Sequence, residues 1–183
     1  MMLTLTRAEM LERWRLHHGL LPLSDSATVT ATVPTVADSF HYAAIEEWYT
    51  RLLLTAPAHQ IDPVDYGRRI TLPAGADGGV TFTLPREALR LLSVRLMGWW
   101  CDARIISDPA EVNREARLQL DLYTRATESD PVALVRPGGF VTLYPAPDSP
   151  VAESILCAAR HTDGTYRFEE SSLPLDQIPT NNF

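Results

Sequence analysis

The chain has 183 residues, of which 45% are hydrophobic and 21% are charged, a composition typical of a folded domain with a substantial apolar core. Its formal net charge of -7 disfavours a protein whose whole surface binds nucleic acid, because phosphate contacts need clustered cations. No run of 18 or more apolar residues is present, so no membrane span is predicted. The N-terminal MMLTLTRAEM lacks the basic-then-apolar layout of a signal peptide, so we expect synthesis in the cytoplasm.

The first predicted element is a helix within residues 1–19. Thr6 and Glu9 have the spacing of a capping box, in which each side chain binds the other residue's backbone N–H. Apolar residues follow at helical spacing, and Gly19 is expected to end the helix. Residues 20–37 then mix proline, serine and threonine with β-branched residues, which predicts an extended linker.

A second helix is predicted to begin at a cap formed by Asp38 or Ser39 and to be stopped by Pro57. Its apolar residues recur at intervals of three and four, which places them on one face. This predicted face consists of Ile45, Trp48, Tyr49, Leu52 and Leu53.

The chain after residue 63 has the character of β-structure. Three hairpins are predicted from paired apolar runs around glycine-containing turns, namely 69–73 with 80–85, 132–136 with 140–144, and 155–160 with 165–170. The segment 91–97 fits either a helix or a strand, and we interpret it as a strand that buries Leu92, Val94 and Leu96. A helix capped at Asp108 is expected to start at Pro109 and to end near Leu120.

Together these elements predict an α+β fold in which N-terminal helices pack on an antiparallel β-sheet built of hairpins. The α+β domain is expected to span residues 38–170. Residues 171–183 contain two prolines and few apolar residues, so they are predicted to form a flexible docking tail.

No catalytic or metal-binding constellation is recognisable, so we predict a non-enzymatic protein without metal or cofactor. His59, Asp62 and Asp65 could hold a cation, but turn-forming polar residues in a proline-containing loop explain them better. The sequence contains no nucleophile signature and no phosphate-binding glycine loop. Cys101 and Cys157 are far apart in apolar surroundings and are predicted to be buried free thiols.

An interaction surface is predicted instead at the tryptophan pair. Trp99 and Trp100 are consecutive, and consecutive strand residues point to opposite faces, so both cannot enter one core. Either one tryptophan is exposed, or one is covered by the sheet and the other by a helix. An exposed tryptophan beside Arg95 or Arg104 would suit an interface, because Trp and Arg are enriched at binding hot spots.

The order of motifs in the middle of the chain resembles that of small head-to-tail connector proteins of tailed phages. The motifs are VTFTLP followed by REALRLLSVRLMGWW, which contains the step LP-x-x-x-LRL, and later RPGGFVTLYP. The segment IEEWYTRLLLTAPAHQID is similar to the helix that enters those proteins. The resemblance covers roughly Ser39 to Arg160 and is nearest to connectors of Bacteroides-type prophages and crAss-like phages, which are similar to podovirus tail adaptors and gatekeepers.

The resemblance implies a structural subunit of the virion neck, made in the cytoplasm of the bacterial host. Such a subunit would form a ring, commonly a dodecamer, with the portal protein and tail proteins as its partners. Contact with genomic DNA in the channel would be incidental, and no membrane is involved. The alternative is a small soluble α+β domain that binds a ligand or acts as an enzyme, with a pocket between helix and sheet.

Overall fold

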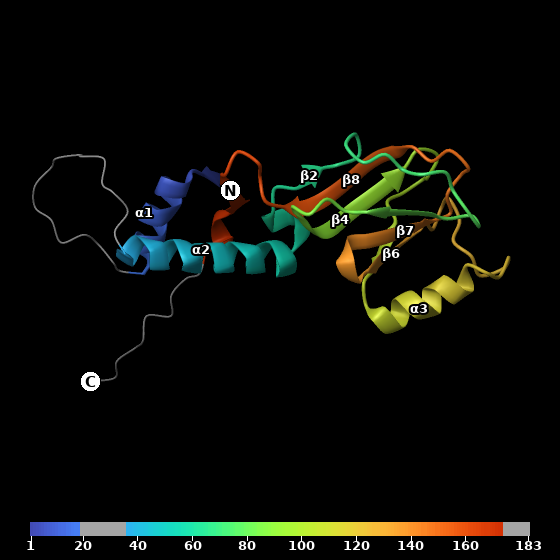
Figure 1. Cartoon of the computed structure of the whole chain (residues 1–183), viewed down its shortest axis with the longest axis horizontal. Helices are drawn as coiled ribbons and strands as arrows, with labels where there is room; N and C mark the ends of the chain where they lie inside the picture. The colour runs from blue at the N-terminus through green and yellow to red at the C-terminus, as the bar shows by residue number, and fades with distance from the viewer. Residues whose placement is uncertain (19–35, 174–183) are drawn as a thin grey trace, which may run out of the picture. The chain divides into compact units, whose positions relative to one another are not determined.

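A computed structural model describes residues 1–18 and 36–173 of the chain (Figure 1). The described part divides into two compact units, which we call unit 1 (residues 1–62 together with the chain from residue 161) and unit 2 (residues 63–160). This division differs from the expected single domain over 38–170. Most of the predicted linker 20–37, and residues 174–183 of the predicted tail, lie outside the described residues.

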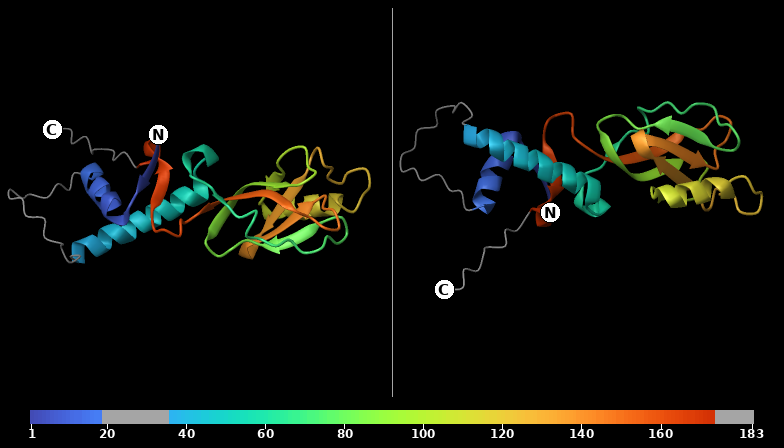
Figure 2. Two further views of the ribbon diagram at one scale, coloured as in Figure 1. Left: turned by 90° about the horizontal axis from the view of Figure 1, so that it is seen from above. Right: turned by 60° about the horizontal axis from the view of Figure 1, so that its bottom comes forward.

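Unit 1 combines helices with a small antiparallel sheet (Figure 2). Strand β1 pairs with β9 at the other end of the sequence, with Leu3 opposite Phe168. The tail prediction is wrong for its first residues, because residues 170–172 form a helical turn and Leu173 is buried. The elements of unit 1 are β1 (Met2–Leu5), α1 (Arg7–His17), α2 (Val36–Thr55), η1 (Ala58–Gln60), β9 (Tyr166–Glu169) and η3 (Glu170–Ser172).

Helix α2 supplies much of the core of unit 1. Ile45, Tyr49 and Leu53 are buried as predicted, whereas Trp48 and Leu52 are half-buried. The aromatic rings of α2 pack edge-on against β9. The ring centroids are 5.1 Å apart between Trp48 and Phe168 and 5.0 Å apart between Tyr49 and Tyr166. The predicted packing of an N-terminal helix on an antiparallel sheet is therefore confirmed within this unit.

The ends of the two long helices test the predicted caps. The Thr6–Glu9 capping box is present at the start of α1. The predicted start of α2 is wrong, because the helix begins at Val36 and Asp38 lies in its first turn. There the Asp38 carboxylate accepts a hydrogen bond from Arg15 of α1, so it joins two helices rather than capping one. Helix α2 ends at Thr55, just before Pro57, as expected.

Unit 2 is a layered structure of two sheets and one helix. The sheet β2-β8-β4 packs on the sheet β3-β7-β6-β5 through a shared apolar core. Helix α3 covers the other face of the second sheet, where Val112 packs against Val132 and Leu134 (Figure 1). The elements of unit 2 are β2 (Val64–Asp65), β3 (Val80–Thr83), β4 (Ala88–Leu96), β5 (Arg104–Ile106), α3 (Pro109–Leu118), β6 (Val132–Arg136), η2 (Pro137–Gly139), β7 (Phe140–Tyr144) and β8 (Ala152–Ala159).

Of the three predicted hairpins, only β6–β7 is confirmed. Its turn needs the positive φ angles of Gly138 (82°) and Gly139 (76°), which side chains disfavour. Residues 69–73 form no strand, and β3 pairs with β7 instead. Strand β8 pairs with β2 and β4, not with β9. The second sheet is also mixed rather than antiparallel, because α3 returns the chain to make β5 and β6 parallel.

The remaining local predictions concern β4, α3 and the cysteines. Segment 91–97 lies in and just after strand β4, but a bulge between Leu91 and Ser93 buries Leu91 in place of Leu92. Helix α3 has the predicted Asp108 cap and ends at Leu118. Both thiols are free and Cys157 is buried, but the prediction that Cys101 is buried is wrong. None of the described helices is long and apolar enough to cross a membrane.

Candidate functional site

The tryptophan pair lies in the turn that follows β4. Gly98 has a φ of 96°, and this left-handed residue turns the chain between the strand and the pair. As a result Trp99 is 4% exposed and Trp100 is 75% exposed. The Trp99 indole Nε1 donates a hydrogen bond of 3.0 Å to the Pro145 carbonyl. Of the two sequence-based alternatives, the one with an exposed tryptophan is therefore correct, and that residue is Trp100.

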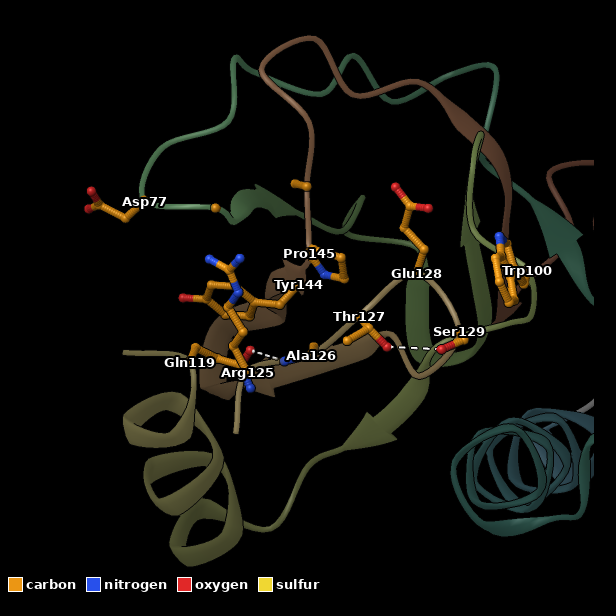
Figure 3. Close-up of a pocket in the computed structure, with 12 residues that line it drawn as sticks. Asp77, Trp100, Gln119, Arg125, Ala126, Thr127, Glu128, Ser129, Tyr144 and Pro145 are labelled. Atoms are coloured by element: carbon orange, nitrogen blue, oxygen red, sulfur yellow. Dashed lines mark hydrogen bonds between the residues drawn. The ribbon is translucent and has the colours of Figure 1, made fainter. Parts of the chain in front are cut away.

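Trp100 lines a hollow of unit 2, which we call the groove and which has a volume of about 570 Å³ (Figure 3). The turn before β3, the end of β7 and the loop after α3 contribute the other walls. The lining residues are Asp77, Gly78, Trp100, Gln119, Arg125, Ala126, Thr127, Glu128, Ser129, Tyr144, Pro145 and Ala146.

Hydrogen bonds hold the loop after α3 in place. The Trp100 backbone N–H donates to the Glu128 carbonyl at 2.9 Å, which ties this loop to the turn after β4. The Gln119 side chain accepts from the Ala126 backbone N–H at 2.8 Å, and the Thr127 and Ser129 hydroxyls lie 3.0 Å apart. The groove is therefore formed before any partner binds.

The Tyr144 ring forms a wall of the groove because residue 79 is a glycine. A Cβ atom at Gly79 would lie 2.4 Å from the tyrosine ring, a distance that no side chain tolerates. The absence of a side chain thus lets the ring lie flat against the backbone. Pro145 continues the wall from Tyr144 toward Trp100 (Figure 3).

The polar and charged side chains of the groove differ between its two ends. Arg125 and Gln119 lie on the Tyr144 side, whereas Glu128 lies on the Trp100 side (Figure 3). Within residues 1–18 and 36–173, Arg125 and Glu128 have no ion-pair or side-chain hydrogen-bond partner, and the same holds for Asp77 at the rim. These charges are open to a partner.

Large exposed apolar side chains also occur in the segments that flank the groove residues in the sequence. Met97 and Val151 are joined by a backbone hydrogen bond of 2.9 Å next to the tryptophan turn. Three more lie between Gln119 and Arg125, including Tyr123, which is 93% exposed. Exposed apolar clusters of this kind mark interaction surfaces. We call the set of Met97, Trp100, Leu120, Leu122, Tyr123 and Val151 the apolar rim.

The two predicted interface arginines have different surroundings. The Arg95 Nη2 donates to the carbonyls of Trp99 and Trp100 at 3.3 Å each, and its Nε lies 3.2 Å from Glu153. Arg95 therefore supports the tryptophan turn. Arg104 instead pairs with the buried Glu115 of α3 at 3.4 Å. Of the four predicted residues, Arg95, Trp99 and Trp100 thus come together, and Arg104 belongs to the packing of α3.

The two aspartates considered for metal binding, Asp62 and Asp65, make contacts within the fold. Asp62 lies 3.1 Å from Arg167 and 3.8 Å from His161. Asp65 accepts hydrogen bonds from the backbone N–H groups of Gly67 and Ile155 at 2.8 and 3.1 Å. In the part of the chain that the structure describes, no group of three or more His, Cys, Asp or Glu side chains could hold a metal ion.

The arginine beside Asp62 also binds a second carboxylate. Arg167 donates to Asp163 at 2.7 Å, and Asp163 accepts two further hydrogen bonds from Thr165. The bonds from Thr165, followed by those from Arg167, hold the pKa of Asp163 well below its usual range. This cluster of opposite charges is internally satisfied.

The two cysteines differ in their surroundings. Burial, followed by the nearby Asp65 charge, raises the pKa of Cys157 to about 12, so this thiol stays protonated at neutral pH. Cys101 is exposed, and its Sγ lies 3.4 Å from the Ser129 carbonyl.

Unit 1 has a hollow of its own, of about 660 Å³, between the start of α1 and α2. Its charged groups already have partners. The Arg7 guanidinium stacks over Tyr42, 4.2 Å from the ring centroid, and Glu46 accepts a 2.5 Å hydrogen bond from Tyr166. The groove of unit 2 is the better candidate site.

Sequence reasoning did not find most of the groove. It singled out Trp100 but missed Gln119, Arg125, Glu128 and Tyr144. The available signal was the loop after α3, where Leu120, Leu122 and Tyr123 interrupt a polar segment.

A search of protein-family models finds no family that matches this chain, and a search of curated proteins finds no match either.

Proposed function

We propose that this protein is a non-enzymatic structural subunit of a phage virion neck, which joins the portal side of the head to the tail as one member of a ring. The observation that best supports the proposal is the exposure of the large side chains of the apolar rim in unit 2. The phage context rests on the resemblance of the sequence motifs to head-to-tail connectors.

The apolar rim supports an assembly role because it would be costly to leave in water. Tyr123 is 93% exposed, Leu120 86% and Trp100 75%, although each of these side chains gains from burial. Full burial of one such side chain contributes on the order of 1.5–3 kcal/mol. Contact with another subunit, the portal protein or a tail protein would cover them.

The proposal is tested by the mass of the protein in solution and by electron microscopy of the protein, alone and mixed with the portal protein. We expect rings alone or on the portal. Leu120→Asp with Tyr123→Asp should reduce assembly because it places charges in the contact, and both positions are too exposed to affect folding strongly. Phe40→Asp, on the exposed face of α2, is the matched control.

Solution mass and electron microscopy can also contradict the proposal. A protein that stays monomeric at high concentration, forms no ring and does not bind the portal protein contradicts the proposal. Neighbouring genes give an independent check, because a connector gene should lie among portal, capsid and tail genes.

The second candidate function is a small-ligand or enzyme domain, and the groove is the observation that favours it. Its volume of about 570 Å³ lies within the range of small-molecule sites, and its walls come from the loop after α3, the end of β7 and two turns. A screen of metabolites by thermal shift tests this candidate. Stabilisation of a monomer that Tyr144→Ala abolishes would favour it over the connector.

A further inference from the structure

We propose that the groove of unit 2 binds an extended, proline-containing segment of a partner protein, with a positively charged side chain of that segment against Trp100 and Glu128. This inference deepens the proposed function, because it names the chemistry of a partner that the assembly surface would take. It rests on the shape, hydrogen-bonding groups and charge of the groove.

The walls of the groove suit a proline-containing segment. Tyr144 and Pro145 form one continuous wall, and Trp100 lies beyond Pro145 on the same side of the hollow (Figure 3). Polyproline segments dock in grooves lined by aromatic side chains, because their rings stack on flat surfaces and lose little conformational entropy. Residue 79 is a glycine, which leaves the space that the Tyr144 ring occupies in this wall.

The groove also offers hydrogen-bond donors for such a segment. A polyproline helix makes no internal hydrogen bonds, so its carbonyl groups need outside donors. The Arg125 guanidinium, the Tyr144 hydroxyl and the Trp100 indole N–H have no hydrogen-bond partner among the described residues. Each of them can donate to a carbonyl of a bound chain.

The charge of the groove selects a basic partner. The residues that line the groove include two acidic side chains, Asp77 and Glu128, and one basic side chain, Arg125. At the Trp100 end, the Glu128 backbone is bonded to that of Trp100, and its carboxylate is unpaired within the described chain. An exposed indole face beside a carboxylate attracts an arginine or lysine through cation–π and ionic attraction together.

The unpaired carboxylates of the groove disfavour residues 174–183 of a second copy as the occupant. Residues 174–183 read PLDQIPTNNF and contain two prolines, but their one charged side chain is acidic. A peptide of this sequence therefore provides a natural comparison with a basic one.

The test measures binding of a fluorescent peptide, Ala-Pro-Pro-Arg-Ala-Pro-Pro-Ala, to the full chain by fluorescence anisotropy. We expect saturable binding that weakens as salt is raised. Replacing the peptide arginine by glutamine, or Trp100→Ala in the protein, should weaken binding by about 3- to 30-fold, the range of one cation–π contact. Glu128→Gln should weaken it and reduce its salt dependence.

Two variants serve as controls. Phe140→Ala removes an exposed aromatic ring from unit 2 outside the groove, and Glu111→Gln removes an exposed carboxylate from α3. Neither should change the affinity.

Three results would overturn the inference. They are the absence of saturable binding up to about 1 mM peptide, equal affinity for the glutamine peptide, and tighter binding of the 174–183 peptide, which would identify a second copy as the occupant. The proposed ring is judged separately, because its readout is assembly and its variants are Leu120→Asp and Tyr123→Asp. Rings without peptide binding would refute the inference alone.

Discussion

The ion pairs of unit 1 and the charged side chains in the groove of unit 2 differ in whether they have a partner. In unit 1 they are paired within the unit, as in Arg13–Glu170 at 2.5 Å and Arg167 between Asp62 and Asp163. In the groove of unit 2, Arg125 and Glu128 have no such partner within the described residues.

The apolar residues differ in the same sense. The aromatic rings of α2 and β9 pack on one another in unit 1, whereas Trp100 and Tyr123 of unit 2 face solvent. Unit 1 also exposes some large apolar side chains, such as Phe40 and Leu16, so the contrast is between the aromatic core of unit 1 and the exposed aromatic residues of unit 2. The difference indicates where a partner would bind.

The largest expected effect comes from the core of unit 1. Phe168 is fully buried and packs against Trp48 and Tyr49. Phe168→Ala should lower the free energy of unfolding by about 3–5 kcal/mol, because it removes apolar burial and leaves a cavity. Denaturant unfolding measures this loss. Trp100→Ala, which removes an exposed ring, should cost less than about 0.5 kcal/mol. Similar losses for the two variants would erase the contrast between the units.

An intermediate effect is expected at Trp48. Its ring contacts Phe168 and Trp14, but the side chain is only half-buried. Trp48→Ala should therefore cost about 2–3 kcal/mol, less than a fully buried aromatic residue. The exposed Phe40 on the same helix gives the matched control, Phe40→Ala. A loss below about 1 kcal/mol would mean that the Trp48 contacts add little to the core.

A smaller, pH-dependent effect is expected at Asp163. Its folded-state pKa lies below the unfolded value because Thr165 and Arg167 stabilise the carboxylate. Its contribution to stability is therefore complete above about pH 4 and is lost as the pH falls toward the folded-state pKa. Asp163→Asn should be less stable than the unmodified protein at neutral pH, and the difference should shrink in acid.

Unfolding curves at several pH values measure that difference directly. Asp148→Asn, at an exposed aspartate of unit 2, is the control. A stability gap between Asp163→Asn and the unmodified protein that stays constant down to strong acid would show that Thr165 and Arg167 do not stabilise the carboxylate.

Several elements were predictable because their signals lie within a few residues. The capping box at Thr6 and the Asp108 cap before Pro109 each satisfy free N–H groups of the helix that they begin. The Pro137-Gly138-Gly139 turn supplies the positive φ angles that its hairpin needs. The apolar face of α2 follows from periodicity, and the α+β class follows from these elements together.

Long-range pairing was not predictable from such signals. The hairpins expected for residues 69–73 and 155–160 failed because β3 and β8 found other partners, and β9 joined β1 from the opposite end of the sequence. Strand pairing depends on which apolar faces can be buried together, and a single sequence shows that an apolar face exists without showing which other face covers it.

The candidate site, like the strand pairing, could be predicted only in part from the sequence. The sequence by itself determined the fold class, the caps of α1 and α3, and the tryptophan pair as a candidate interface. Only the tertiary structure decided that Trp100 faces outward, since that follows from the turn at Gly98 and the packing of Trp99 against Pro145. The tertiary structure also brought Glu128, Arg125 and Tyr144 to Trp100, because the walls of a groove come from separate segments that meet only when their shared core is buried.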